Sequence, residues 1–188
     1  MKKIYFFILI LVIGLTAESQ TPQFYNRLPT TGGNVFPFNT APTTGKKVQW
    51  AIAAGEFNQP SPAPGGNNIT AIWFRPNAAC NATYTNLTIR LATVPTTTFI
   101  PGIGQWYAGP MTTVRSQNTT ITTSAALTWT SIPLTTPFPY DPTMNLIIEV
   151  SQCGFTGTGF SINQDVVDVA PNYRRQYSDA TSACGVTV

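Results

Sequence analysis

The sequence predicts an all-β protein, an antiparallel two-sheet β-sandwich with jelly-roll or Greek-key wiring. Helical periodicity is missing almost everywhere after the first apolar run, whereas short runs rich in β-branched and aromatic residues recur between clusters of Pro, Gly and Asn. Charged residues make up only 9% of the 188 residues, against roughly 25% in an average soluble protein. Uncharged polar residues therefore provide most of the solvation.

Residues 1–19 predict a secretory signal peptide. Two lysines follow Met1, an apolar run extends over Ile4–Leu15, and the small residues Ala17 and Ser19 precede Gln20. Because the run is too short to span a bilayer, we expect cleavage after Ser19 and a bacterial product that is exported to the cell surface or beyond without inserting in the membrane. An uncleaved N-terminal anchor helix is the competing interpretation.

Residues 20–45 predict an irregular lead-in, since Pro and Gly recur throughout it, and residues 46–188 predict the β-sandwich domain. The runs of strand-forming residues in this domain are bounded by turn formers. The expected strands are Lys46–Ala53, Asn68–Phe74, Thr85–Thr93, Gln105–Val114, Thr119–Thr123, Leu127–Leu134, Met144–Ser151, Phe160–Asn163 and Asn172–Ser178.

Side-chain alternation predicts which faces of these strands are buried. Asn68–Phe74 is apolar on both faces, so we place it in the centre of a sheet, and we expect Trp73 and Trp129 in the core. In Thr85–Thr93 every second residue is apolar, which predicts one face on the core and one in water. The run Gly157–Gly159 indicates a turn.

The strand Met144–Ser151 follows an Asp141-Pro142 dipeptide, which is typical of a type I turn. Alternation within the strand predicts two sets of side chains on opposite faces. The core set is Met144, Leu146, Ile148 and Val150, and the opposite set is Asn145, Ile147 and Glu149.

Three segments carry a resemblance to a known kind of protein: ITAIWFRP at Ile69–Pro76, WYAGP at Trp106–Pro110, and TPFPYDPTMNLIIEV at Thr136–Val150. In this order they resemble secreted β-sandwich modules of environmental Gram-negative bacteria, of the kind that precede a C-terminal sorting or anchoring tail. The likeness extends over most of residues 46–177. These modules have no established activity, so the resemblance implies an extracellular accessory or structural role. No such tail precedes Val188, so either the module is the whole protein or a longer product has been cut here.

Composition excludes several classes of function. The chain has no histidine, which removes the usual general base, the Ser-His-Asp triad and every His-based metal site. Asp165 and Asp168 are the only closely spaced acids after the signal, and three apart on a strand they point to opposite faces. We expect no enzyme and no cofactor, with calcium at Asp165, Asp168 or Asp141 as the alternative. A formal net charge of +3 predicts no nucleic-acid patch.

The three cysteines predict one disulfide in an exported protein. We expect Cys153 to pair with Cys184, because each is followed by glycine and closes a strand-like run, and Cys80 to be free. The alternative is that all three are reduced and buried.

Trp106 and Tyr107 are the candidate ligand-binding residues. Being adjacent on an expected strand, one of them faces inward and the other meets solvent or a partner, and exposed aromatic rings stack on the apolar faces of sugars. We expect a surface, matrix, adhesion or self-assembly module whose partners are surface proteins or further copies. The alternative is a carbohydrate-binding module that targets an extracellular polysaccharide.

Overall fold

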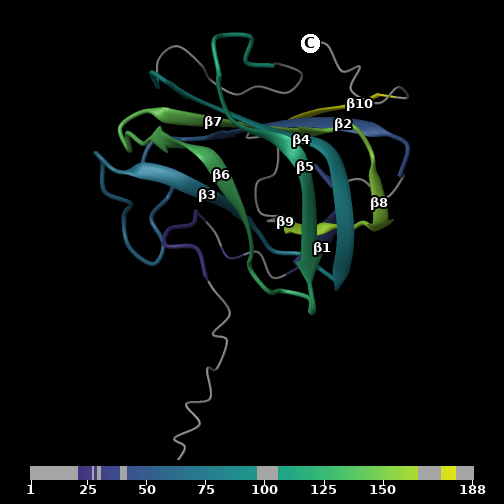
Figure 1. The fold of residues 1–188 in the computed structure, drawn as a ribbon. Helices are drawn as coiled ribbons and strands as arrows, with labels where there is room; N and C mark the ends of the chain where they lie inside the picture. Colours follow the sequence, from purple (N-terminus) through teal and green to yellow (C-terminus); the bar gives the residue numbers. More distant parts are fainter. Residues whose placement is uncertain are drawn as a thin grey trace, which may run out of the picture.

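Figure 1 shows the computed structural model of the protein, which describes residues 21–26, 28, 31–38, 42–96, 106–164 and 175–180. These residues form antiparallel β-sheets and contain no helix, which confirms the predicted all-β class. Consequently no helix in the described part of the chain is long and apolar enough to cross a membrane. The predicted signal peptide lies outside the described residues.

The described chain contains ten strands. They are β1 Thr31–Asn34, β2 Gly45–Ile52, β3 Asn68–Phe74, β4 Cys80–Val94, β5 Thr112–Thr123, β6 Thr130–Pro139, β7 Asn145–Gln152, β8 Phe155–Thr158, β9 Ile162–Gln164 and β10 Arg175–Ala180.

The largest sheet has six strands in the order β10-β2-β7-β4-β5, with β8 also paired to β4. Two smaller sheets consist of the pairs β3–β6 and β1–β9. In Figure 1 the β3–β6 pair lies below β7 and β2, while β4 and β5 run together down one side. All of the pairings are antiparallel.

The long strand β4 organises the large sheet. β5 lies along one edge of it, and β7 and β8 follow one another along the other edge. Between β7 and β8 the chain passes through Cys153 and Gly154, whose backbone groups exchange hydrogen bonds with Thr85 at 2.9 Å each. Gly154 has φ +97°, a conformation that favours glycine. The backbone is therefore interrupted between β7 and β8, while both strands stay paired with β4.

One core cluster joins the large sheet to the β3–β6 pair. Leu87, Ile89 and Leu91 are fully buried, which confirms the predicted core face of β4. The lead-in contributes Phe38, whose ring stacks on Phe160 with centroids 4.4 Å apart. The other buried members are Cys80, Ala82, Tyr84, Val114, Ile121, Ile132, Phe138, Leu146, Ile148, Val150 and Phe155.

The prediction that Asn68–Phe74 is a central strand is wrong, although its bounds are correct. Among the described strands, β3 pairs only with β6, and its apolar residues are half-buried. Ile72 and Phe74 pack against the core, so Trp73 between them points to the opposite face. Trp73 and Trp129 are both half-buried and do not belong to the core cluster.

Other differences concern segments where backbone contacts override local preference. Two expected strands are one continuous strand, β5, while Trp106–Met111 is not a strand. Gly157 and Thr158 belong to β8 rather than to a turn, because β8 approaches β4 closely at Gly157. The lead-in also contains the short strand β1.

Candidate functional site

The face of the large sheet opposite the core, here called the outer face, carries a row of polar side chains. Strand register places Gln49 of β2 next to Glu149 of β7, and Glu149 next to Arg90 of β4. Since Ile148 and Val150 point into the core, Glu149 points to the outer face, as alternation predicts. The polar row therefore follows from the alternation within each strand and from the pairing between strands.

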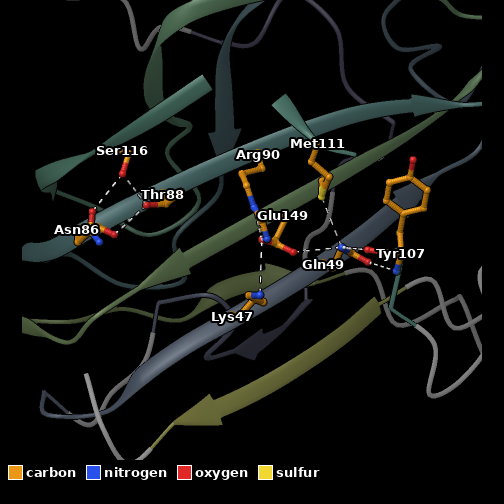
Figure 2. Close-up of polar contacts among 9 residues, drawn as sticks. All are labelled: Lys47, Gln49, Asn86, Thr88, Arg90, Tyr107, Met111, Ser116 and Glu149. Atoms are coloured by element: carbon orange, nitrogen blue, oxygen red, sulfur yellow. Dashed lines mark hydrogen bonds and ion pairs between the residues drawn. The ribbon is translucent and has the colours of Figure 1, made fainter. Parts of the chain in front are cut away.

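Glu149 is the centre of this row (Figure 2). Its Oε1 accepts hydrogen bonds from Arg90 Nε at 2.7 Å and from Arg90 Nη2, and lies 3.9 Å from Lys47 Nζ. Its Oε2 accepts a hydrogen bond from Gln49 Nε2 at 3.2 Å. Although Glu149 is only 2% exposed, cationic and amide donors compensate its charge.

Lys47 is also buried beside this carboxylate. Burial lowers the pKa of Lys47, the negative charge of Glu149 raises it again in part, and the nearby Arg90 guanidinium lowers it further. The ammonium group lies 5.7 Å from the centre of the Trp106 ring, within range of a cation–π interaction. Lys47 therefore lies between Trp106, one of the two predicted ligand-binding residues, and the carboxylate of Glu149.

The segment Trp106–Met111 covers one end of the outer face. The Tyr107 amide donates to Gln49 Oε1 at 2.7 Å, and Gln49 Nε2 donates to the Tyr107 carbonyl at 3.2 Å. Met111 Sδ lies 3.8 Å from the same amide nitrogen of Gln49. Figure 2 shows Gln49 between Glu149 and this segment. Gln49 thus links the segment both to the sheet and to Glu149.

This attachment changes the expected exposure of Trp106 and Tyr107. Both residues are half-buried and lie outside a strand, so the strand alternation on which the prediction of one inward and one outward ring rests does not apply to them. The reason is that the segment lies across the sheet instead of forming a strand in it. Tyr107 and Met111 pack against a small apolar cluster on the outer face, made of Ala51, Ala92, Val94 and Ile147.

Beyond Arg90 the outer face becomes uncharged. The hydroxyls of Thr88 and Ser116 are 3.0 Å apart, and Ser116 also donates to Asn86 Oδ1 at 3.2 Å (Figure 2). The Asn86 backbone amide donates to Asn118 Oδ1 at 2.9 Å, across a bulge in β4. These bonds connect β4 to β5 through side chains as well as through the backbone.

The uncharged region continues over three neighbouring strands. Strand register forms two rows, Thr156 with Thr83 and Thr120, and Thr158 with Asn81 and Thr122. The Thr83 and Thr120 hydroxyls are 2.8 Å apart, and Thr122 donates to Asn81 Oδ1 at 3.1 Å. Because cross-strand hydrogen bonds restrict their rotamers, these side chains present a fixed polar surface.

Two other described carboxylates hold turns. Glu56 Oε2 accepts a hydrogen bond from the Ala53 amide at 2.9 Å. Asp141 Oδ1 accepts from Thr143 Oγ1 at 2.6 Å and from the Thr143 amide at 2.9 Å, and these bonds lower the pKa of Asp141. Asp141 therefore forms the turn that the Asp-Pro sequence predicts.

The remaining predicted site residues are only partly described. Asp165, Asp168 and Cys184 lie outside the described residues, so the calcium alternative and the Cys153–Cys184 disulfide stay predictions. Cys80 is a buried free thiol whose Sγ lies 3.9 Å from the Ile121 carbonyl. Within the described ranges, no group of three or more acids and cysteines is placed to hold a metal ion.

Two aromatic clusters were not found from the sequence. Near the start of β6, the Trp129 ring lies 5.8 Å from the Tyr25 ring and 5.5 Å from the Arg75 guanidinium carbon. At the edge strand β10, the Tyr177 ring lies 4.0 Å from the Phe36 ring. For the second cluster, the sequence indicates only that Arg175 and Tyr177, two apart on a strand, lie on the same face. Their partner Phe36 is far away in the chain.

Comparison with known proteins identifies no relative from which a function could be inferred. No protein-family model, no curated protein and no solved structure matches the chain.

Proposed function

We propose that the chain is a secreted, non-enzymatic module that acts by contact at a surface, in adhesion, in a matrix or in self-assembly. In this proposal the large sheet and the β3–β6 pair are the two layers of a β-sandwich with jelly-roll or Greek-key wiring. The core cluster to which the large sheet and the β3–β6 pair both contribute supports that arrangement.

The uncharged part of the outer face is the observation that carries the proposal. It extends over β8, β4 and β5, its residues are mostly exposed, and cross-strand hydrogen bonds fix several of them. A partner that binds there orders few side chains and desolvates no charge, and both effects lower the free-energy cost of association. A rigid neutral sheet surface is therefore suited to contact.

The use of three acids whose side chains the structure describes supports a non-enzymatic role. Glu149, Glu56 and Asp141 each accept hydrogen bonds that hold the fold or a turn. A general acid or base must instead be able to reach a substrate and change its protonation state. These carboxylates therefore act as structural groups.

The test replaces neutral side chains of the outer face by cations. We expect the double variant Thr120→Lys, Thr122→Lys to lose self-association, measured by sedimentation velocity, and adhesion to washed cells of the producing organism, because an interface would then bury two charges. Thr70→Lys, an exposed threonine of β3, is the matched control and keeps both properties. Equal association of wild type and the double variant, at unchanged thermal unfolding, contradicts the proposal.

A carbohydrate-binding module is the second candidate, favoured by the half-buried Trp106 ring near Lys47. We expect Trp106→Ala to lose retention on an insoluble polysaccharide with only a small decrease in the unfolding midpoint, because one cation–π contact with Lys47 is lost. Tyr107→Ala lowers that midpoint as well, because Tyr107 packs on the apolar cluster of the outer face. Retention of Trp106→Ala at the wild-type level excludes this role for Trp106.

A further inference from the structure

We infer that β10 carries a binding site for an acidic polysaccharide, in which Tyr177 stacks on a uronic-acid ring and Arg175 binds the carboxylate of that ring. The inference rests on the proposed function only in placing the ligand outside the cell. The site is separate from the outer face, because Arg175 and Tyr177 share the opposite face of the sheet with Trp50 and Val48.

Tyr177 is an exposed ring with a fixed support. It is 51% exposed, and its ring lies against Phe36 with an angle of 31° between the ring planes. Phe36 is held in turn, since its amide donates to Asn34 Oδ1 at 3.0 Å and Lys46 Nζ lies 4.2 Å from its ring centre. A sugar that stacks on Tyr177 therefore meets a ring that is already ordered, which lowers the entropic cost of binding.

Arg175 supplies a cation next to this ring. Its guanidinium carbon lies 5.0 Å from the centre of the Phe36 ring. Within the described part of the chain, the guanidinium has neither a hydrogen bond nor an ion pair, although the residue is half-buried. Burial lowers the pKa of Arg175, but a guanidinium remains charged at neutral pH. A partly desolvated cation without an anionic partner favours an anionic ligand.

The spacing of the two residues selects the ligand. Residues two apart on a strand lie on the same face, about 6.8 Å from each other. In a uronic acid the carboxylate is attached to a ring carbon, so a ring stacked on Tyr177 directs it sideways, toward Arg175. A neutral sugar leaves the guanidinium without an anion, and an acidic peptide offers no rigid ring for Tyr177.

The place of β10 in the fold admits a polymer. Among the described strands it is an edge strand of the large sheet, and the Tyr177 ring is exposed there. Several sugar units of a chain then lie along this edge, and the weak contacts of single units add together.

The experiment measures binding of polygalacturonate to the mature protein by affinity electrophoresis and calorimetry, with dextran as the neutral polymer and polyglutamate as the acidic peptide. We expect binding to polygalacturonate alone. Tyr177→Ala and Arg175→Gln each weaken it about tenfold, which corresponds to about 1.4 kcal/mol. Tyr177→Phe binds polygalacturonate like the wild type, since it keeps the aromatic ring. The double variant Thr120→Lys, Thr122→Lys also binds, because the outer face is not part of this site.

Four results overturn the inference. They are no binding of polygalacturonate at millimolar uronate, equal binding of dextran, equal binding of polyglutamate, and loss of binding in Arg175→Gln but not in Tyr177→Ala. The last result reveals charge attraction without stacking. None of them affects the proposed contact function, whose readout is association through the outer face.

Discussion

At the scale of single residues, Cys80 and Tyr84 place a thiol and a phenol inside the core. Burial is the main cause that raises the pKa of both groups above their ordinary values of 9.0 and 10.0. Among the described residues the Tyr84 hydroxyl has no hydrogen-bond partner. The folded state therefore keeps both protons at a pH where the unfolded chain releases them.

This difference predicts a loss of stability in alkaline solution. The stabilising contribution is complete below about pH 9 and decreases as the pH rises toward the folded-state pKa values, because only the unfolded chain gains free energy by ionising. Lys47 acts in the opposite direction, since its lowered pKa makes the folded state release a proton first. We expect urea unfolding to show a decreasing free energy of unfolding above about pH 9 in the wild type.

Tyr84→Phe is the matched variant for this measurement. It keeps the ring in the core, removes the titrating group, and should leave the free energy of unfolding at pH 7 within about 1 kcal/mol of the wild type. As the pH rises, the free energy of unfolding of Tyr84→Phe should decrease less than that of the wild type. An unchanged pH dependence in both Tyr84→Phe and Cys80→Ala contradicts the assignment.

Single residues also show how far the sequence predicts the candidate site. Alternation alone places Glu149 on the face opposite the core, as observed. Its partners Arg90 and Gln49, which lie 59 and 100 positions away, depend on strand register that no local pattern contains. The adjacency of two aromatic residues makes Trp106 and Tyr107 candidates in the sequence, but their exposure depends on a backbone that crosses the sheet.

At the scale of elements, β8 depends on a close approach to β4. A Cβ atom on Gly157 would lie 2.3 Å from the Asn81 carbonyl oxygen, and Gly157 has φ +89°. The sequence suggested a turn here because Gly-Thr-Gly is common in turns, whereas the glycine is needed for strand packing. Local composition cannot distinguish these two uses of glycine, since both require a residue without a side chain.

Replacing Gly157 tests this interpretation against a control with similar backbone. Gly55 has φ +73° and would have nothing within 4 Å of an added Cβ. Gly55→Ala should cost only the conformational strain, about 1 kcal/mol. Gly157→Ala should cost more than about 2 kcal/mol, since the clash with Asn81 adds to the strain. Equal losses of stability in urea unfolding would show that β8 moves away freely.

At the scale of the whole molecule, the antiparallel all-β class follows from short β-branched runs between turn formers, and the bounds of β3 match the prediction. The sequence does not predict which strands share a sheet, because an apolar strand such as β3 can lie at the edge of a sheet as well as in its centre. Alternation describes the two faces of one strand and gives no information about its neighbours.

The predicted disulfide links distant parts of the molecule. If Cys153 and Cys184 are bonded, the double variant Cys153→Ala, Cys184→Ala should lower the free energy of unfolding by on the order of 2 to 4 kcal/mol, because the unfolded chain is no longer constrained. Non-reducing peptide mapping identifies the crosslink directly. Cys80→Ala leaves the crosslink in place. A crosslinked peptide that contains Cys80 would overturn the pairing.

The register of β10 determines how the molecule responds to tension. Ala180 pairs with Gly45, so the end of β10 and the start of β2 lie at the same end of the strand pair. A force that pulls these two points apart opens the hydrogen bonds one after another, instead of loading them all at once. Without the predicted Cys153–Cys184 crosslink, β10 would detach at low force while β2, β7 and β4 stay paired, and a ligand on the proposed uronate site would be released before the domain unfolds. With the crosslink, the chain that follows β10 is tied to the residue after β7, so the same force would load a covalent bond and the ligand would stay attached.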